Sequence, residues 1–174
     1  MWQTISSKEV FSHPRLSLIE DEVVLANGKK THYLTYKEAG NGATIICRDP
    51  EGRILVQKEY SYPPNETIFQ FPGGLVPRTE DAAIGANREL MEEAKLYANT
   101  LTPLGSYLIN NRRTDARMFV FLATDLETRS LPEDDEEVLE HFWKTEQEIE
   151  VMMRTGELIQ AHALASWSLY KLHC

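Results

Sequence analysis

The sequence contains few cysteines and no long hydrophobic run, and both absences restrict the class of protein. Its 174 residues include two cysteines, Cys47 and Cys174, which stand far apart. This excludes a disulfide-rich scaffold and predicts reduced thiols in a cytoplasmic protein. The longest apolar segments, such as residues 118–123, fall far below the roughly 20 residues of a membrane-spanning helix. The first residues lack the basic and apolar regions of a secretory signal, so we expect no such signal, and the short apolar runs predict no membrane association.

Positive charge is also scarce. The chain has 18 Lys and Arg against 27 Asp and Glu, a formal net charge of −9. This disfavours a protein that binds the phosphate backbone of nucleic acid through a basic surface. An acidic protein can still act on an anionic substrate if bound cations reverse the local field. No repeat, low-complexity tract or linker interrupts the chain, whose 42% hydrophobic content is ordinary for a globular domain.

Short strand-forming segments fill the first part of the chain. Runs of β-branched and aromatic residues bounded by turn residues predict strands at residues 10–11, 16–19, 23–25, 32–36, 43–47, 54–56 and 67–71. The Asn27-Gly28 pair predicts a type I′ hairpin turn between two of them. Pro72-Gly73-Gly74 is expected to stop the last one.

Helices and further strands follow. Residues 80–95 are predicted to be helical, because Ala83, Ala86 and Leu90 recur at helical spacing on an inward face. Strands are expected at residues 101–109, 118–123 and 138–143. A capping box at residues 145–148 opens a second helix that Gly156 closes, before a last helix at residues 158–172. Because strands and helices do not alternate, the fold class is α+β or a helix–sheet sandwich, not a doubly wound nucleotide fold.

Three carboxylates gather on one side of the predicted central helix. At about 100° of rotation per residue, Glu89, Glu92 and Glu93 share an arc of roughly 100° opposite Leu90. Like charges at this spacing cost a few tenths of a kcal/mol per pair, roughly, unless they are neutralised. Hard divalent cations such as Mg²⁺ prefer carboxylate oxygens. Acidic clusters on helices are usually solvated faces, so the cluster alone leaves both interpretations open.

The wider spacing around this cluster resembles a family motif. Gly74 is followed after five residues by Glu80 and after seven more by Arg-Glu-Leu-Met-Glu-Glu-Ala-Lys-Leu at residues 88–96. This resembles the Nudix box, with Lys95 in place of the box's final glycine. The resemblance implies a Nudix-like helix–sheet–helix sandwich, with residues 41–174 as the hydrolase domain.

Most of the remaining chain is similar to the ADP-ribose pyrophosphatase branch of the Nudix hydrolases. The similarity begins with N-terminal strands that contain Trp2 and Tyr33, and it continues through residues 58–63, 137–143 and 153–158. It implies that residues 1–40 form an N-terminal antiparallel strand extension of the same unit, through which the branch forms homodimers.

The resemblance also implies a metal site. Glu89, Glu92 and Glu93 would be Mg²⁺ ligands or groups that position the base, with the carbonyl of Gly73 as a further ligand. Mn²⁺ is the expected substitute cation.

Support and acid–base roles follow from the same resemblance. Gly74, Glu80 and Arg88 would support the box structurally. A later loop glutamate is often the general base in this branch; Glu137 matches best and Glu136 is second, while Glu92 is the alternative inside the box. The acidic stretch at residues 131–137 could equally be a solvated loop.

Departures from the branch concern substrate binding. Ser61 stands where an arginine often meets the diphosphate, and Gln70 stands where a glutamate is common. The expected proline after the box is missing, and residues 110–113 occupy its region. Arg112 and Arg113 either replace the lost arginine as phosphate contacts or belong to an exposed loop.

Two residues of the strand before Ser61 complete the candidate substrate-binding set. They are Lys58 and Tyr60, and the tyrosine either stacks on a base or packs structurally.

The expected function is Mg²⁺-dependent hydrolysis of a nucleoside diphosphate linked to another group, first ADP-ribose to AMP and ribose 5-phosphate. One alternative keeps the chemistry but acts on another nucleotide sugar, a dinucleoside polyphosphate or an oxidised nucleotide. Another is a non-catalytic nucleotide-binding regulator. Such regulators usually add a DNA-binding domain, and no segment after residue 143 is long or basic enough for one.

Overall fold

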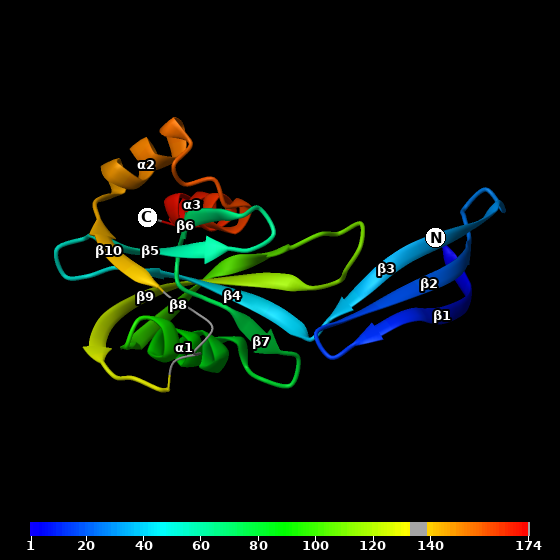
Figure 1. Ribbon diagram of the computed structural model, residues 1–174, viewed down its shortest axis with the longest axis horizontal. Coiled ribbons are helices and arrows are strands. Elements are labelled where there is room, and N and C mark those ends of the chain that lie inside the picture. The colour runs from blue at the N-terminus through cyan, green and yellow to red at the C-terminus, as the bar shows by residue number, and fades with distance from the viewer. Residues whose placement is uncertain (133–138, 174) are drawn as a thin grey trace.

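The computed structural model describes residues 1–132 and 139–173 and contains a helix–sheet–helix sandwich with an N-terminal sheet projecting from it (Figure 1). The projecting sheet is antiparallel, in the order β1 (Gln3–His13), β2 (Leu16–Val24), β3 (Lys30–Glu38). The central sheet has the order β7 (Leu75–Pro77), β4 (Gly40–Cys47), β9 (Arg117–Thr128), β8 (Leu96–Leu108), and its β4–β9 pair is parallel. A third, antiparallel sheet has the order β10 (Glu140–Lys144), β5 (Ile54–Ser61), β6 (Glu66–Gln70).

Within the described residues, three helices cover the sheets. They are α1 (Ala82–Glu93), α2 (Glu146–Thr155) and α3 (Ala161–His173). Alternation along β4 explains the two layers: Ile45 packs with Leu90 of α1, whereas Ile46 packs with Trp167 of α3. All four side chains are buried, so the sheet has an apolar core on each face. The α+β sandwich with its N-terminal strand extension is therefore confirmed.

The turn between β2 and β3 differs from the predicted type. The hairpin is present, but Gly28 alone in this turn has a positive φ, of 81°, whereas a type I′ turn also requires one at Asn27. The amide of Gly28 donates to the carbonyl of Leu25, and that of Leu25 to Lys29. This is the pattern of a type I turn with a glycine bulge, so the type I′ prediction was wrong.

Helix α2 begins and ends as the sequence predicts. Thr145 is its N-cap, and the reciprocal hydrogen bonds with Glu148 form the capping box. Gly156 closes it in the left-handed conformation. The last helix starts at Ala161 rather than residue 158, because the amide of Leu158 still bonds to Met152 at the end of α2.

Other elements differ mainly in their bounds. Strands β1, β8 and β9 are longer than predicted, and β7 was not predicted. Cys47 is fully buried, as expected for a small core residue, and burial together with the nearby Glu93 charge raises the pKa of its thiol. Cys174 lies outside the described residues. Over the part of the chain that is described, no helix combines the length and apolar character needed to cross a membrane.

Helix α1 is shorter than the predicted 80–95 at both ends. Asp81 caps it by accepting hydrogen bonds from the amides of Ala83 and Ile84. At the other end, Lys95 itself adopts a left-handed conformation, with φ of 56°. The side chain that replaces the box glycine therefore sits where a glycine is normally preferred.

Replacing Lys95 by glycine is expected to raise the free energy of unfolding by about 0.5–1 kcal/mol, because glycine adopts this φ without steric cost. Urea denaturation measures the change. The matched control is Lys95→Ala, which also removes the ammonium group but keeps a Cβ at the same φ and should bring no gain. Equal stability of both variants would contradict the strain argument.

Candidate active site

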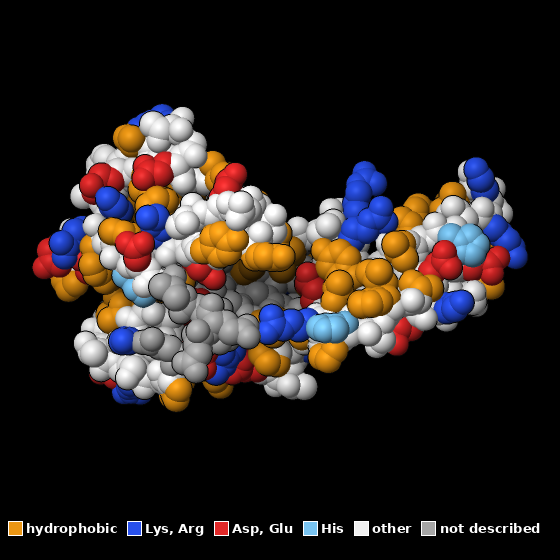
Figure 2. All heavy atoms as spheres, in the orientation of Figure 1, with side chains coloured by type: hydrophobic (Ala, Val, Ile, Leu, Met, Phe, Trp, Pro, Cys, Tyr) orange, Lys and Arg blue, Asp and Glu red, His pale blue; other side chains and the backbone are white. Residues whose placement is uncertain are grey.

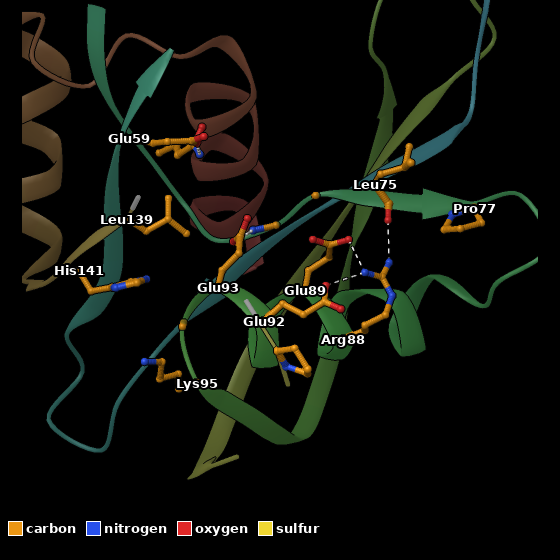
Figure 3. A pocket seen from close by; sticks show the side chains of 15 residues that line it. Glu59, Leu75, Pro77, Arg88, Glu89, Glu92, Glu93, Lys95, Leu139 and His141 are labelled. Carbon is orange, nitrogen blue, oxygen red and sulfur yellow. Dashed lines mark hydrogen bonds and ion pairs between the residues drawn. The ribbon is translucent and has the colours of Figure 1, made fainter. Parts of the chain in front are cut away.

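An open pocket of about 810 Å³ lies over the C-terminal part of α1 and the turn before β7 (Figure 3). Four carboxylates line it: Glu59 from β5 and Glu89, Glu92 and Glu93 from α1. The cationic side chains on its described lining are those of Arg88 and Lys95, so carboxylates outnumber them. Such a pocket favours bound cations over a bare anion.

Two glycines make room at the wall of the pocket. Gly73 has φ of 145°, and a Cβ there would lie 2.0 Å from the carbonyl oxygen of Ala43. A Cβ on Gly74 would lie 2.3 Å from Oε2 of Glu89. Hydrogen bonds from Ala43 to Gly74 and from Ile45 to Pro72 fix this turn on β4. The turn therefore approaches the sheet at Gly73 more closely than any side chain would permit, and a side chain at Gly74 would displace the carboxylate of Glu89.

Arg88 organises the carboxylates. Its Nη1 donates to Oε1 of Glu89 at 2.7 Å and to Oε2 of Glu92 at 2.8 Å, and its Nη2 reaches Oε2 of Glu80 at 3.2 Å. Nη2 also donates to the carbonyl of Leu75 at 2.8 Å (Figure 3). Burial alone lowers the pKa of Arg88, but the hydrogen bonds with Glu80 and Glu89 and the neighbouring charges outweigh it and raise the pKa overall. The predicted support pair of Glu80 and Arg88 is thus in contact.

Glu93 is held on the other side of the pocket. Its Oε2 accepts a hydrogen bond from the amide of Gly73 at 2.9 Å and one from Nε2 of Gln57 at 3.1 Å. The helix, the glycine turn and β5 therefore meet at one carboxylate oxygen. The predicted role of the Gly73 carbonyl as a ligand stays a prediction.

The donor set fits a hard divalent cation, although it is not a closed cage. Among the described residues, no three side chains of the metal-binding types are gathered closely enough to hold an ion by themselves. Arg88 bonds to both Glu89 and Glu92, so an ion there competes with its guanidinium. Mg²⁺ usually keeps several waters and uses one or two carboxylates together with substrate phosphates. Four lining carboxylates meet that requirement.

A chain of side-chain amides supports Glu59. Gln70 donates to Oε2 of Glu59 at 2.6 Å, and Gln160 donates to Oε1 of Gln70 at 2.6 Å. Gln70, noted in the sequence as a departure, therefore orients a pocket carboxylate and connects it to the segment before α3.

The candidate substrate residues of β5 do not line the pocket in this chain. Lys58 lies 3.6 Å from Oε1 of Glu140, and Tyr60 donates to Asn65. Because side chains alternate along a strand, Glu59 faces the pocket between them. The same alternation puts Gln57 on the face of Glu59.

The two candidate arginines line a different pocket, beside the projecting sheet. Nη1 of Arg113 donates to the carbonyl of Leu34, and Tyr33 donates to the carbonyl of Arg112. These contacts attach the loop between β8 and β9 to β3. Glu136 and Glu137, the candidate general bases, lie outside the described residues.

The sequence interpretation did not select Gln57, Glu59 or His141, of which Glu59 and His141 line the pocket. A usable signal existed for the first two: residues 55, 57 and 59 share one face of β5, and Leu55 packs in the core layer of α1. Strand alternation predicts the shared face, and the packing of Leu55 shows that this face is directed toward α1.

Comparisons with known proteins agree with this geometry. A family model described as NUDIX domain matches residues 39–166. The chain is 33% identical over 137 residues to the ADP-ribose pyrophosphatase of Bacillus subtilis, covering 76% of this chain and 74% of that one. It is 28% identical over 137 residues to the ADP compounds hydrolase NudE of Escherichia coli, covering 78% and 74%. A crystal structure of an ADP compounds hydrolase superposes with a TM-score of 0.86 at 20% identity, covering 98% of this chain and 92% of that one.

Proposed function

The chain belongs to the Nudix family as a pyrophosphohydrolase of the ADP-ribose pyrophosphatase-like branch, and from this premise we propose that it hydrolyses ADP-ribose to AMP and ribose 5-phosphate with bound Mg²⁺. The observation that supports the proposal most is the convergence of Glu59, Glu89, Glu92 and Glu93 on one pocket beside the glycine turn. Mn²⁺ is the expected substitute cation.

Each part of the site has a proposed role in the reaction. Glu89, Glu92 and Glu93, with the carbonyl of Gly73, would hold the cation. When bound, the cation neutralises phosphate charge and lowers the pKa of a water molecule. Glu137 would take the proton from the attacking water, with Glu136 second and Glu92 as the alternative. Arg88 would hold Glu89 and Glu92 in place and offset their repulsion, because its Nη1 bonds to both.

The experiment is turnover with Mg²⁺ on a panel containing ADP-ribose, nucleotide sugars, dinucleoside polyphosphates and triphosphates, with the products identified. A clear preference for ADP-ribose, giving AMP and ribose 5-phosphate, is the expected result. Preference for another member would reject the substrate and keep the chemistry. Tight nucleotide binding without any turnover would instead support the non-catalytic regulator.

One observation favours a different nucleotide substrate as the second candidate. On the described lining, Arg88 is the sole arginine, and it already bonds to three carboxylates. Ser61 leaves the chain without the arginine that the branch often places on the diphosphate. A substrate whose diphosphate is held mainly by bound cations, such as another nucleotide sugar, would suit this pocket. The same panel distinguishes the two.

We also propose that residues 1–40 form a dimerisation extension of the hydrolase domain at residues 41–174. Strand β1 is exposed along its whole length, and hydrophobic side chains gather over the projecting sheet (Figure 2). Trp2, Phe11 and Leu34 are among the large exposed apolar residues there. Light scattering during gel filtration should give twice the chain mass of 20.0 kDa. A mass of one chain would contradict the dimer.

We further propose that the protein is located in the cytoplasm. The support for this location is the unpaired Cys47 thiol, which is buried in the core.

A further inference from the structure

Gln57 is a polar side chain at the end of the buried part of β5. It lies in the middle strand of its sheet, paired with Gln70 of β6 and His141 of β10, and it is fully buried. The three residues before it, at 54–56, are all buried hydrophobics. Burying an amide costs free energy unless its hydrogen bonds are made, so its presence here needs a specific reason.

The hydrogen bond of Gln57 is made to the pocket. Its Nε2 donates to Oε2 of Glu93 at 3.1 Å, on the same oxygen that accepts the amide of Gly73 at 2.9 Å. Two donors from two different elements therefore fix one oxygen of the Glu93 carboxylate. These two hydrogen bonds restrict rotation of the Glu93 carboxylate about its Cγ–Cδ bond. The direction of Oε1 is then determined by the position of Oε2.

The other end of the amide favours a role for Gln57 beyond stability. Among the described residues, Oε1 of Gln57 has no hydrogen-bond partner. A buried acceptor left in this way destabilises the folded state. Turning the amide over would place its oxygen against the Glu93 carboxylate, so Glu93 determines the orientation. A methionine of similar length would avoid the unpaired oxygen but could not donate to Glu93.

We propose that Gln57 is a positioning residue, which orients Glu93 for binding a divalent cation. The inference rests on the proposed function, in which Glu93 is a cation ligand. It adds a residue of β5 to the cation site, outside the box on α1. Residues that hold metal ligands in place typically contribute a factor of roughly 10–100 in metal affinity.

The test measures Mn²⁺ affinity directly on the full chain, by electron paramagnetic resonance, without substrate. Gln57→Met is expected to weaken Mn²⁺ binding by about 10-fold or more. Thermal unfolding and circular dichroism establish that the variant is folded. Gln57→Asn serves as a second variant, because it retains an amide but is too short by one methylene group to make the same contact; it should weaken binding as well.

The matched control is Ser166→Ala, a change at another fully buried polar side chain, located in α3 and outside the pocket lining. It should leave Mn²⁺ affinity within about 2-fold of the unaltered chain, since it removes no contact to Glu93. Equal weakening by Ser166→Ala and Gln57→Met would indicate general loosening of the core and would overturn the inference.

A double-mutant cycle with Glu93→Gln separates the possible failures. If Gln57 acts through Glu93, Gln57→Met has little further effect on Mn²⁺ affinity in the Glu93→Gln background. Independent, additive effects would overturn the positioning role. If Glu93→Gln weakened Mn²⁺ binding but neither Gln57→Met nor Gln57→Asn did, the positioning role of Gln57 would also be overturned. The proposed function would remain intact. No change in Mn²⁺ affinity with Glu93→Gln would instead overturn the ligand assignment on which both rest.

Discussion

Glu93→Gln is expected to lower kcat/KM for the preferred nucleotide by about 10²–10³-fold, the range found when one group that stabilises transition-state charge is removed. The substitution keeps the size of the side chain but removes its charge. The one oxygen of the new side-chain amide can still accept from Gly73 and Gln57, as Oε2 of Glu93 does now, so an NH₂ group that cannot bind a cation would take the place of Oε1. Both changes weaken the hold on a cation that neutralises phosphate charge.

Steady-state kinetics at several Mg²⁺ concentrations measure this effect. Glu150→Gln is the matched control, because Glu150 is also a helical glutamate but lies on α2, outside the pocket lining, with ion pairs to Lys171 at 3.5 Å and Arg154 at 3.9 Å. It should change kcat/KM by less than about 2-fold. Full activity of Glu93→Gln at low Mg²⁺ would contradict the assignment of Glu93 as a cation ligand.

Helical periodicity predicted the carboxylate face of α1 well. The spacing of Ala86 and Leu90 identified the buried side, and both residues are fully buried beneath the central sheet. With that face fixed, the positions of Glu89, Glu92 and Glu93 near one pocket follow from the geometry of any helix. Helical periodicity could not predict which groups bind these carboxylates. Arg88 bonds to Glu89 and Glu92, whereas Gln57 of β5 bonds to Glu93.

Contacts between distant segments were harder to predict. The residues predicted to bind substrate in β5 were Lys58 and Tyr60. Because side chains alternate along a strand, they lie on the opposite face from Gln57 and Glu59, which are directed toward the pocket and α1. For the loop with Arg112 and Arg113, the sequence offered only the charge of the two side chains as a guide to its position. Its attachment to β3 depends on backbone carbonyls, which carry no signal in the side-chain pattern.

Arg88→Met is the prediction with the largest expected effect on stability. It removes the cation that bonds to Glu80, Glu89 and Glu92 and leaves three carboxylates close together. The Arg88 side chain is 30% exposed and that of Glu89 13%. The expected loss in the free energy of unfolding is therefore about 2 kcal/mol, between the roughly 3–5 kcal/mol of a broken buried pair and the roughly 1 kcal/mol of an exposed one.

The cation dependence of that loss tests the electrostatic explanation. Mg²⁺ should raise the melting temperature of Arg88→Met more than that of the unaltered chain, because a divalent cation bound at Glu89 and Glu92 no longer competes with a guanidinium. Arg154→Met, at the exposed ion pair on α2, should lose less than about 0.5 kcal/mol and show no such difference. If Mg²⁺ stabilised Arg88→Met and the unaltered chain equally, Arg88 would support the fold through its bond to the Leu75 carbonyl rather than by balancing the charges of the site.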